Sequence, residues 1–402
     1  MVYYEIKKVF SRMSSRIALT LLLVTLAVTC WFAVMGVYYV NENGDEEKGI
    51  TAIHKLREQK KEWAGLLTEE RIAEVISENA RINATAQAKS EDFQENDIAY
   101  SKKQGFDDIR RLLVYSYGDF NNYDYYLPDR LSPDDAGMFY PNRILHLEEW
   151  LRGDAKDLFT EREKQFLIEK YKGLETPLVY DYMEGWLQAS QYAPTVIMIT
   201  VLLLGFLTAN IFSGEFQTKA DAVFFSSYHG RKKAITAKIK AGFWITTGIY
   251  WIVMLLYSAV VLGILGTDGA SCPIQAVPGG WKSFYSVTNL QQYLLVLAGG
   301  YIGSLFLMFL TMLISAKVRL AVVAVTVPFI MIFLPSFLST DRIAGLLPDQ
   351  LLQMNMVIRQ FNLYELGEKV LGAAPILPIL YTVLTLVMIP VLYQIYRRAQ
   401  LR

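Results

Sequence analysis

The chain has 402 residues, and its 39 Lys and Arg residues balance its 39 Asp and Glu residues. With 53% hydrophobic residues and a mean hydropathy of +0.24, it is too apolar for an ordinary soluble protein and too charged for one buried wholly in a membrane. Residues 41–191 hold 31 acidic and 20 basic residues, whereas the remainder holds 8 acidic and 19 basic residues. This asymmetry excludes a single soluble enzyme domain, and the long apolar runs exclude a disordered or repeat-built chain.

Residues 1–16 predict an amphipathic helix that lies in the membrane interface before the first span. Its apolar residues recur at helical spacing with basic residues between them: Val2, Ile6, Val9, Phe10 and Met13 alternate with Lys7, Lys8 and Arg12. The alternative is a short cytoplasmic helix that continues into the first span.

Six apolar runs predict six transmembrane helices, because each has about the 20 residues needed to cross roughly 30 Å of hydrocarbon. None contains Asp, Glu, Lys, Arg or His. The first run is too long for a signal peptide and no small-residue cleavage site follows it, so we expect it to be retained. The six runs are Ile17–Val40, Ala193–Phe212, Ala241–Leu265, Tyr293–Leu313, Leu320–Leu338 and Ile376–Tyr396.

The basic residues near the span ends predict the orientation, because cytoplasmic segments are enriched in Lys and Arg. The N-terminus, residues 213–240, residues 314–319 and the tail 397–402 together carry 15 basic residues, whereas the two short segments on the other side carry 4. We therefore expect a multi-pass protein of the cell membrane with both termini cytoplasmic. Three segments are then predicted to be extracellular: residues 41–192, 266–292 and 339–375, the last being amphipathic.

The extracellular domain, residues 41–192, is long enough to bury a core of its own and is predicted to be mainly helical. Thr68 before Glu69 and Glu70 predicts a helix start, and Thr160 with Glu163 forms a capping-box pattern. The tyrosine-rich stretch between Tyr115 and Tyr140 has two interpretations, a ligand contact and packing in the domain core, of which we favour the second.

No pattern of catalytic or metal-binding residues appears in the sequence. The acid pairs Asp134–Asp135 and Glu148–Glu149 are adjacent and do not face each other, so surface charge is the better interpretation. Hydrolase and zinc-protease motifs are missing. The chain is therefore expected to be no enzyme and to hold no metal or cofactor. The cysteines and histidines also lack the spacing of metal ligands. They are Cys30, Cys272, His54, His146 and His229.

The loop of residues 213–240 carries the most informative local pattern. An acid, Glu215, ends the second span, and Thr218 lies in the turn that follows. A short apolar helix with Val223, Phe224 and Phe225 comes next, then a Ser- and Gly-containing break and a basic helix into the third span. Two adjacent phenylalanines require a partner surface, since leaving them in water is costly. The alternative is a basic loop that only fixes topology and contacts anionic lipid.

This loop, with Glu215, Thr218, the short apolar helix and Arg231, resembles that of type-2 ABC exporter permeases. In that family the loop is a coupling helix that docks into a nucleotide-binding ATPase subunit. The resemblance covers residues 1–40 and 193–402 and implies six spans, a second permease copy or related chain, and ATP and Mg²⁺ bound by the ATPase. The large domain 41–191 departs from the compact members. The chain has no Gly-x-x-x-x-Gly-Lys-Ser/Thr motif, so the ATPase would be a separate subunit.

Three functions compete. The resemblance favours the membrane half of an ATP-driven exporter that moves an amphipathic or hydrophobic peptide, drug or lipid by alternating access. An ion-coupled carrier is disfavoured because the six spans have no charged residue. A membrane sensor or immunity protein that binds a ligand through its extracellular domain is the remaining alternative, and no nucleic-acid partner is expected. Gly299 and Gly303 in the fourth span form a Gly-x-x-x-Gly pattern, which permits either close helix packing or loose packing.

Overall fold

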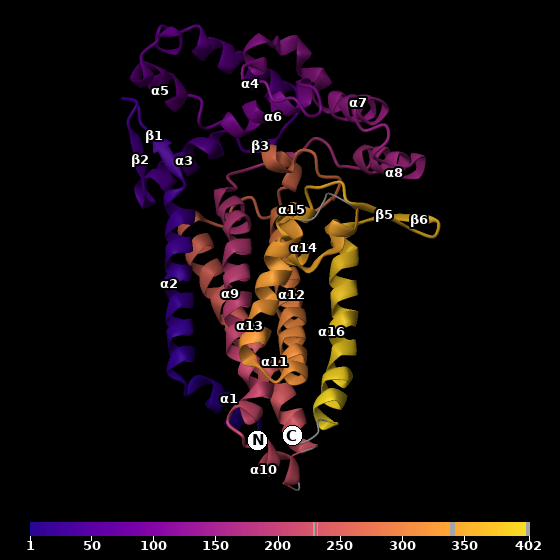
Figure 1. Cartoon of the computed structure of the whole chain (residues 1–402). Coiled ribbons are helices and arrows are strands. Elements are labelled where there is room, and N and C mark those ends of the chain that lie inside the picture. The colour runs from indigo at the N-terminus through magenta and orange to yellow at the C-terminus, as the bar shows by residue number, and fades with distance from the viewer. Residues whose placement is uncertain (228–229, 231, 338–341, 399–402) are drawn as a thin grey trace.

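A bundle of long helices carries a polar domain at one end, and the N-terminus lies at the other (Figure 1). The computed structural model describes residues 1–227, 230, 232–337 and 342–398. Among them, five helices are long and apolar enough to cross a membrane. They are α2 (Met13–Met35), α9 (Glu184–Gln217), α11 (Lys233–Leu265), α12 (Asn289–Val318) and α16 (Ala373–Arg397).

The helical membrane fold is therefore confirmed, but not six full-length spans. Of the run predicted at Leu320–Leu338, residues 320–337 are described, and they form the 13-residue helix α13 (Ala321–Phe333) and a 3-10 turn, Leu334–Phe337. At 1.5 Å per residue, α13 is about 20 Å long, which is shorter than the hydrocarbon layer. Pro335 accounts for its end, because proline has no N–H group with which to continue the helical hydrogen bonds. By contrast, α9 and α11 extend well beyond the predicted runs.

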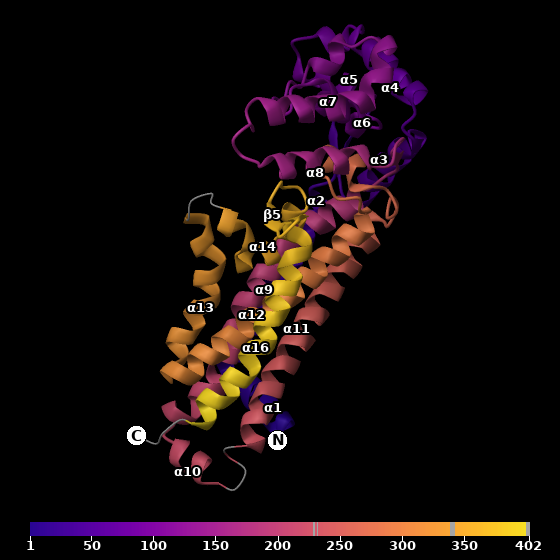
Figure 2. The ribbon, with the colours of Figure 1, turned by 90° about the vertical axis from the view of Figure 1, so that its right-hand side faces the viewer.

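The chain after α13 folds back into the bundle. The short helices α14 (Pro348–Leu352) and α15 (Met354–Val357) lie beside α12, α9 and α16 (Figures 1 and 2). Leu351, Leu352 and Met354 are fully buried there. The hairpin of β5 (Leu363–Leu366) and β6 (Lys369–Gly372) then leads into α16. The amphipathic pattern of residues 339–375 thus reflects packing against the bundle, which the sequence did not indicate.

The first helix, α1 (Val2–Phe10), is separate from the span that follows. Arg12 has an extended backbone between α1 and α2, so α1 does not continue into α2. Ile6, Val9 and Phe10 pack on the end of the bundle, whereas Lys7 is exposed. The predicted amphipathic helix is thus present, and its apolar side faces protein. The alternative expectation, a helix that merely continues into the first span, is wrong in that respect.

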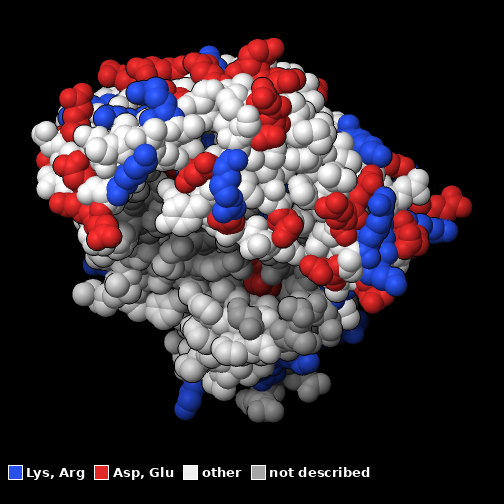
Figure 3. Space-filling view, turned by 90° about the horizontal axis from the view of Figure 1, so that it is seen from above, with Lys and Arg blue, Asp and Glu red and all other residues white. Residues whose placement is uncertain are grey.

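The polar domain, residues 36–183, is mainly helical, and its face carries acidic and basic side chains side by side (Figure 3). Both predicted helix starts are confirmed: the Thr68 side chain accepts from the Arg71 N–H, and Thr160 and Glu163 form a complete capping box. The helices of the domain are α3 (Ile50–Glu62), α4 (Glu69–Asn83), α5 (Phe93–Ser101), α6 (Asp107–Tyr117), α7 (Phe139–Arg152) and α8 (Glu161–Lys172). Its strands form the pairs β1 (Tyr38–Val40) with β2 (Glu46–Lys48), and β3 (Gly65–Leu66) with β4 (Val179–Tyr180).

The core of the polar domain is completed from outside the domain. The loop between α11 and α12 places Cys272 and Trp281 in the same buried cluster as Ile72 and Phe139, and the Trp281 and Phe139 ring centroids are 5.0 Å apart. Most of this cluster comes from the domain itself, so the domain buries a core of its own, to which the loop contributes. The tyrosine-rich stretch divides between our two interpretations: Tyr115, Tyr117 and Tyr140 pack against the core of the domain. The rings of Tyr123, Tyr125 and Tyr126 are instead 46%, 44% and 67% exposed.

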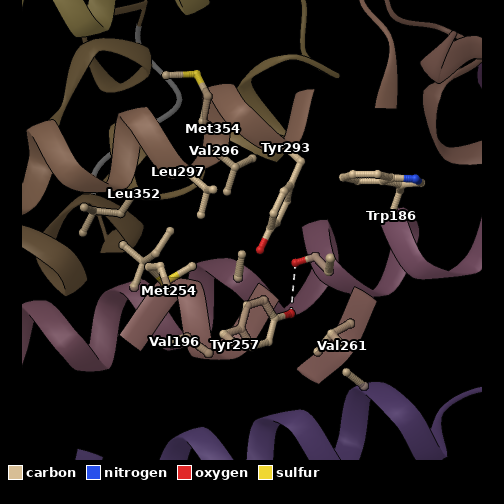
Figure 4. Close-up of a cluster of buried hydrophobic side chains, with 14 of the residues drawn as sticks. Trp186, Val196, Met254, Tyr257, Val261, Tyr293, Val296, Leu297, Leu352 and Met354 are labelled. Carbon is tan, nitrogen blue, oxygen red and sulfur yellow. Dashed lines mark hydrogen bonds between the residues drawn. The ribbon is translucent and has the colours of Figure 1, made fainter. Parts of the chain in front are cut away.

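The interior of the bundle is apolar and aromatic. Figure 4 shows Trp186 of α9, Tyr257 of α11 and Tyr293 of α12 turned toward one another among aliphatic side chains. The Tyr257 hydroxyl donates to the Ala189 carbonyl oxygen at 3.0 Å, so this buried polar group is satisfied within the bundle.

Candidate functional site

We call the end of the bundle that lies opposite the polar domain and holds the N-terminus the terminal end. It brings together α1, the ends of α9, α11 and α16, and the short helix α10 (Asp221–Ser226). In Figures 1 and 2, α10 lies beyond the bundle at this end. The predicted short apolar helix of residues 213–240 is therefore present, and it is the most distant element from the polar domain.

A buried ion pair holds this end together. The Lys238 side chain is fully buried, and its Nζ lies 2.9 Å from Glu215 Oε1 and 2.7 Å from the Ile211 carbonyl oxygen. Glu215 is 5% exposed. A buried ammonium requires both an opposite charge and hydrogen-bond acceptors, and Lys238 has both. This pair connects α11 to the last turn of α9, directly before the chain turns into α10.

The N-terminal helix contributes two more charges to this cluster. Lys8 Nζ lies 2.7 Å from Glu215 Oε1, and Glu5 Oε2 lies 3.1 Å from Lys238 Nζ. Glu215 therefore contacts two ammonium groups, and Lys238 contacts two carboxylates. Because opposite charges alternate, the four groups neutralise one another, and α1 is attached to both α9 and α11.

Aromatic rings attach α10 to the same cluster. Phe225 is 5% exposed, and its ring centroid lies 5.3 Å from that of Tyr396 and 5.9 Å from that of Phe216. The Phe224 ring lies 5.2 Å from Phe225, and Lys238 Nζ lies 5.5 Å from the Phe224 ring centroid. The partner surface that the two phenylalanines require is thus supplied largely by α9 and α16 of the same chain.

The predicted coupling residues consequently fall into different environments. Val223 is 74% exposed and is the apolar side chain that α10 presents outward. Thr218 ends α9, where its hydroxyl donates to the Gly214 carbonyl oxygen at 2.9 Å. Arg231 lies outside the described residues. Phe225 is buried and Phe224 half-buried against the same chain, and the docking of these two residues into a partner subunit stays a prediction.

The sequence interpretation missed Lys238 and Tyr396. Lys238 was counted only as a basic residue that sets topology, and Tyr396 only as the end of the last apolar run. A usable signal exists for Lys238, because Ile235, Lys238 and Ile245 share one helical face, and a charged residue on an otherwise apolar stripe requires a partner.

Gly299 and Gly303 lie where α12 meets α14. A Cβ atom on Gly299 would lie 2.8 Å from the Leu351 carbonyl oxygen, and one on Gly303 would lie 2.5 Å from a Leu352 methyl carbon. The absence of side chains at these two positions permits the close approach of the folded-back segment.

A second ionic cluster connects the polar domain to the bundle. Lys60 of α3 is 5% exposed, and its Nζ lies 2.7 Å from Asp108 and 2.6 Å from Glu184, the first residue of α9. Burial alone would lower the pKa of Lys60, but the charges of Asp108 and Glu184 outweigh it and hold that pKa well above its usual value. Burial would raise the pKa of Asp108, but the Lys60 charge and hydrogen bond hold it below its usual value.

Two further contacts join the polar domain to loops of the bundle. Arg342 forms a bidentate pair with Glu163 at 2.8 and 2.9 Å. The Arg143 guanidinium donates to the Trp281 carbonyl oxygen at 2.7 Å, and burial lowers the pKa of Arg143 to about 10. The polar domain and the bundle are thus connected at three places by ion pairs and hydrogen bonds.

Within the described part of the chain, no three His, Cys, Asp or Glu residues are grouped to hold a metal ion. The chain was also compared with protein-family models, with curated proteins and with solved structures, and nothing matched. A function therefore has to be inferred from the residues and geometry of this chain.

Proposed function

We propose that this chain is the membrane permease subunit of an ATP-driven exporter of the type-2 ABC class, working with a separate ATPase subunit that binds ATP and Mg²⁺. The observation that carries the proposal is the position of α10. A short helix lies beyond the bundle, exposes Val223, and is attached on its inner side to α9, α11 and α16. A force applied to α10 would reach three long helices at once.

The contacts define how such a force would spread. Phe225 would transmit it to Tyr396 and hence α16, while Glu215 and Lys238 would transmit it to α11 and, through Lys8, to α1. Since packed elements move largely as rigid bodies, ATP-driven closure of the partner would shift these helices together. Alternating access between two arrangements of the bundle is the mechanism we infer.

Topology and assembly belong to the same proposal. The terminal end would face the cytoplasm, because it carries most of the basic residues outside the polar domain, and the polar domain would then be extracellular. The short α13, with its 3-10 extension, would provide a sixth crossing where the bilayer is locally thin or where a second permease copy covers it. Apolar side chains such as Val322 and Phe329, 79% and 57% exposed, suit either environment.

The cargo class follows from the bundle interior. The spans carry no charged residue between their ends, and aromatic side chains such as Trp186, Tyr257 and Tyr293 line their contacts. A cargo path along such spans would suit an amphipathic or hydrophobic molecule, for instance a peptide, drug or lipid, rather than a bare ion.

A second candidate is a membrane sensor or immunity protein that binds a ligand through the polar domain. Three exposed tyrosines, Tyr123, Tyr125 and Tyr126, support it, because exposed aromatic side chains are common at binding surfaces. The ionic connection from Lys60 to Glu184 would then pass the signal to α9.

The test is purification of the full chain from its own host in mild detergent, with co-purifying proteins identified by mass spectrometry. We expect a P-loop ATPase at a fixed ratio to the chain, and its loss in a Val223→Glu variant. Ile50→Glu is the matched control, since Ile50 is also an exposed apolar residue, 60% exposed, but lies in the polar domain. An assembly without any ATPase would favour the sensor, and equal retention by both variants would remove α10 as the docking element.

A further inference from the structure

The junction between α1 and α2 forms a crevice against α9, and four of its polar side chains have no partner among the described residues. Arg12, Ser14 and Ser15 line it from the junction, and Asn210 lines it from α9. Ser15 is 3% exposed. Within the described residues, no hydrogen bond or ion pair involves these four side chains. Ser14 is exposed, whereas Arg12 and Asn210 are half-buried and Ser15 is buried. Buried and half-buried polar groups are normally satisfied, so the convergence of Arg12, Ser15 and Asn210 on one crevice points to a missing ligand.

The chemistry of the crevice favours an anion. All four side chains can donate hydrogen bonds, and the Arg12 guanidinium adds a permanent positive charge. The crevice also contains the start of α2, a helix of 23 residues that has no side-chain cap and no acidic residue in its first turn. Free N–H groups and the helix dipole favour negative charge at such a start.

The other charged residues of the crevice do not neutralise Arg12. Glu5 and Lys8 also line the crevice, but Glu5 pairs with Lys238 at 3.1 Å and Lys8 with Glu215 at 2.7 Å. Since these charges are already paired, Arg12 remains the unpaired charge of the crevice, and an incoming anion would meet a net positive site.

The size and surroundings of the crevice identify the kind of anion. Its volume of about 10 Å³ admits one water-sized group, such as a single phosphate oxygen, while the rest of a headgroup would stay at the mouth. Phe206 and Leu207 of α9 line its apolar side, and Ile17 and Leu21 of α2 are 52% and 53% exposed just beyond it. Apolar surface therefore begins directly beside the polar groups, as a lipid with acyl chains requires.

We propose that this crevice binds the phosphate of an anionic phospholipid in the leaflet at the terminal end. Arg12 pairs with the phosphate, and Ser14, Ser15 and Asn210 donate hydrogen bonds to its oxygens. The acyl chains lie along α2. The bound lipid fixes the angle between α1 and α2 and thereby the position of Lys8 beside Glu215. The site needs only that the apolar helices cross a bilayer, so it stands independently of the exporter proposal.

Native mass spectrometry of the full chain, stripped of lipid in detergent, tests the site with three probes: phosphatidylglycerol, diacylglycerol and inorganic phosphate. We expect phosphatidylglycerol to bind, diacylglycerol to bind far more weakly because it lacks the phosphate, and inorganic phosphate not to compete at millimolar concentration. Arg12→Gln should weaken phosphatidylglycerol binding about tenfold, the scale of one charge-assisted hydrogen bond.

Arg16→Gln is the matched control, because Arg16 is exposed on the same turn and lies outside the crevice. Ser15→Ala is a second variant that removes only a hydroxyl group and should weaken binding several-fold without affecting folding. Equal losses in Arg12→Gln and Arg16→Gln would overturn the site in favour of diffuse surface charge. If diacylglycerol bound as tightly as phosphatidylglycerol, the crevice would be only an apolar contact for acyl chains. If inorganic phosphate competed, the crevice would be a site for free phosphate instead of lipid.

Discussion

Lys238 and Glu215 lie 2.9 Å apart at the terminal end, and neither side chain has appreciable contact with solvent. The pair joins α11 to α9 at the point where the chain leaves the bundle for α10. A buried ion pair of this kind contributes little net stability, but the loss of one partner is costly because the other charge remains buried. The pair therefore specifies how α9 and α11 are placed rather than simply strengthening the fold.

Lys238→Met is expected to destabilise the full chain by about 3–5 kcal/mol, because among the described residues it leaves Glu215 with the half-exposed Lys8 as its one charged partner. Combining Glu215→Gln with Lys238→Met should restore most of that loss. Thermal unfolding in detergent measures both effects. Lys240→Met, at an exposed position two residues along the same helix, is the control and should change the Tm little. A Lys238→Met variant as stable as this control would contradict the burial of the pair.

Phe225→Ala is expected to release α10 from the bundle, since it removes the ring that contacts Phe216 and Tyr396. Deleting a buried phenylalanine side chain costs about 3–5 kcal/mol in a protein core. Limited proteolysis should then cut the segment 218–232 faster in Phe225→Ala than in the wild type. Val223→Ala, on the exposed side of α10, should be cut at the wild-type rate. Equal rates in all three proteins would mean that the aromatic contacts do not hold α10.

Gly299→Ala is expected to displace α14 from α12, because the new methyl group would lie 2.8 Å from the Leu351 carbonyl oxygen, a backbone atom that cannot rotate away. Overpacking of this kind costs about 1–3 kcal/mol. Gly248→Ala is the matched control: Gly248 also lies in a long helix, and no atom is within 4 Å of a Cβ placed there. The control should be neutral or slightly stabilising, since alanine favours helices. Equal Tm values for the two variants would show that α14 does not pack closely here.

The Asp108–Lys60 pair predicts a pH dependence for the polar domain. The pKa of Asp108 is lowered in the folded protein, so its contribution is present above the ordinary carboxyl pKa of about 4 and is lost as the pH falls through the lowered value. The pKa of Lys60 is raised, so its contribution is present below about 10.4 and is lost as the pH rises through the raised value. Both contributions are therefore constant across the neutral range.

Asp108→Asn should accordingly lower the Tm at pH 7, and the gap in Tm from the wild type should narrow as the pH falls below about 4, because the unfolded wild-type chain then binds a proton at Asp108 that the folded protein does not. Asp119→Asn is the control, because Asp119 is exposed and forms no ion pair among the described residues. A gap in Tm that stays constant down to pH 3 would show that the pKa of Asp108 is not lowered in the folded protein.

Much of this architecture could be predicted because its signals are local. Five of the six apolar runs form long helices, and Thr68 and Thr160 begin helices as their neighbours indicate. The short helix at Val223 follows from its flanking turn residues. In each case the residues that determine the structure are close together in the sequence.

The remainder depends on contacts between distant segments. Trp281 completes the core of a domain that ends about a hundred residues earlier, and Lys238 pairs with Glu5, which lies 233 residues earlier in the sequence. Neither pairing leaves a periodic signal. The sequence does contain the cause of the end of α13, which is Pro335. The continuous apolar run around this proline nevertheless led to the prediction of a full-length span.

The two cysteines have a practical consequence. Cys30 and Cys272 are 7% and 1% exposed, and burial raises the pKa of Cys272 to about 12. A thiol that is both covered and protonated reacts slowly with maleimides. The natural protein should therefore give almost no background in thiol labelling. A single engineered cysteine, at Val223 or at Ile50, can report through a membrane-impermeant reagent which side of the membrane each end of the molecule occupies.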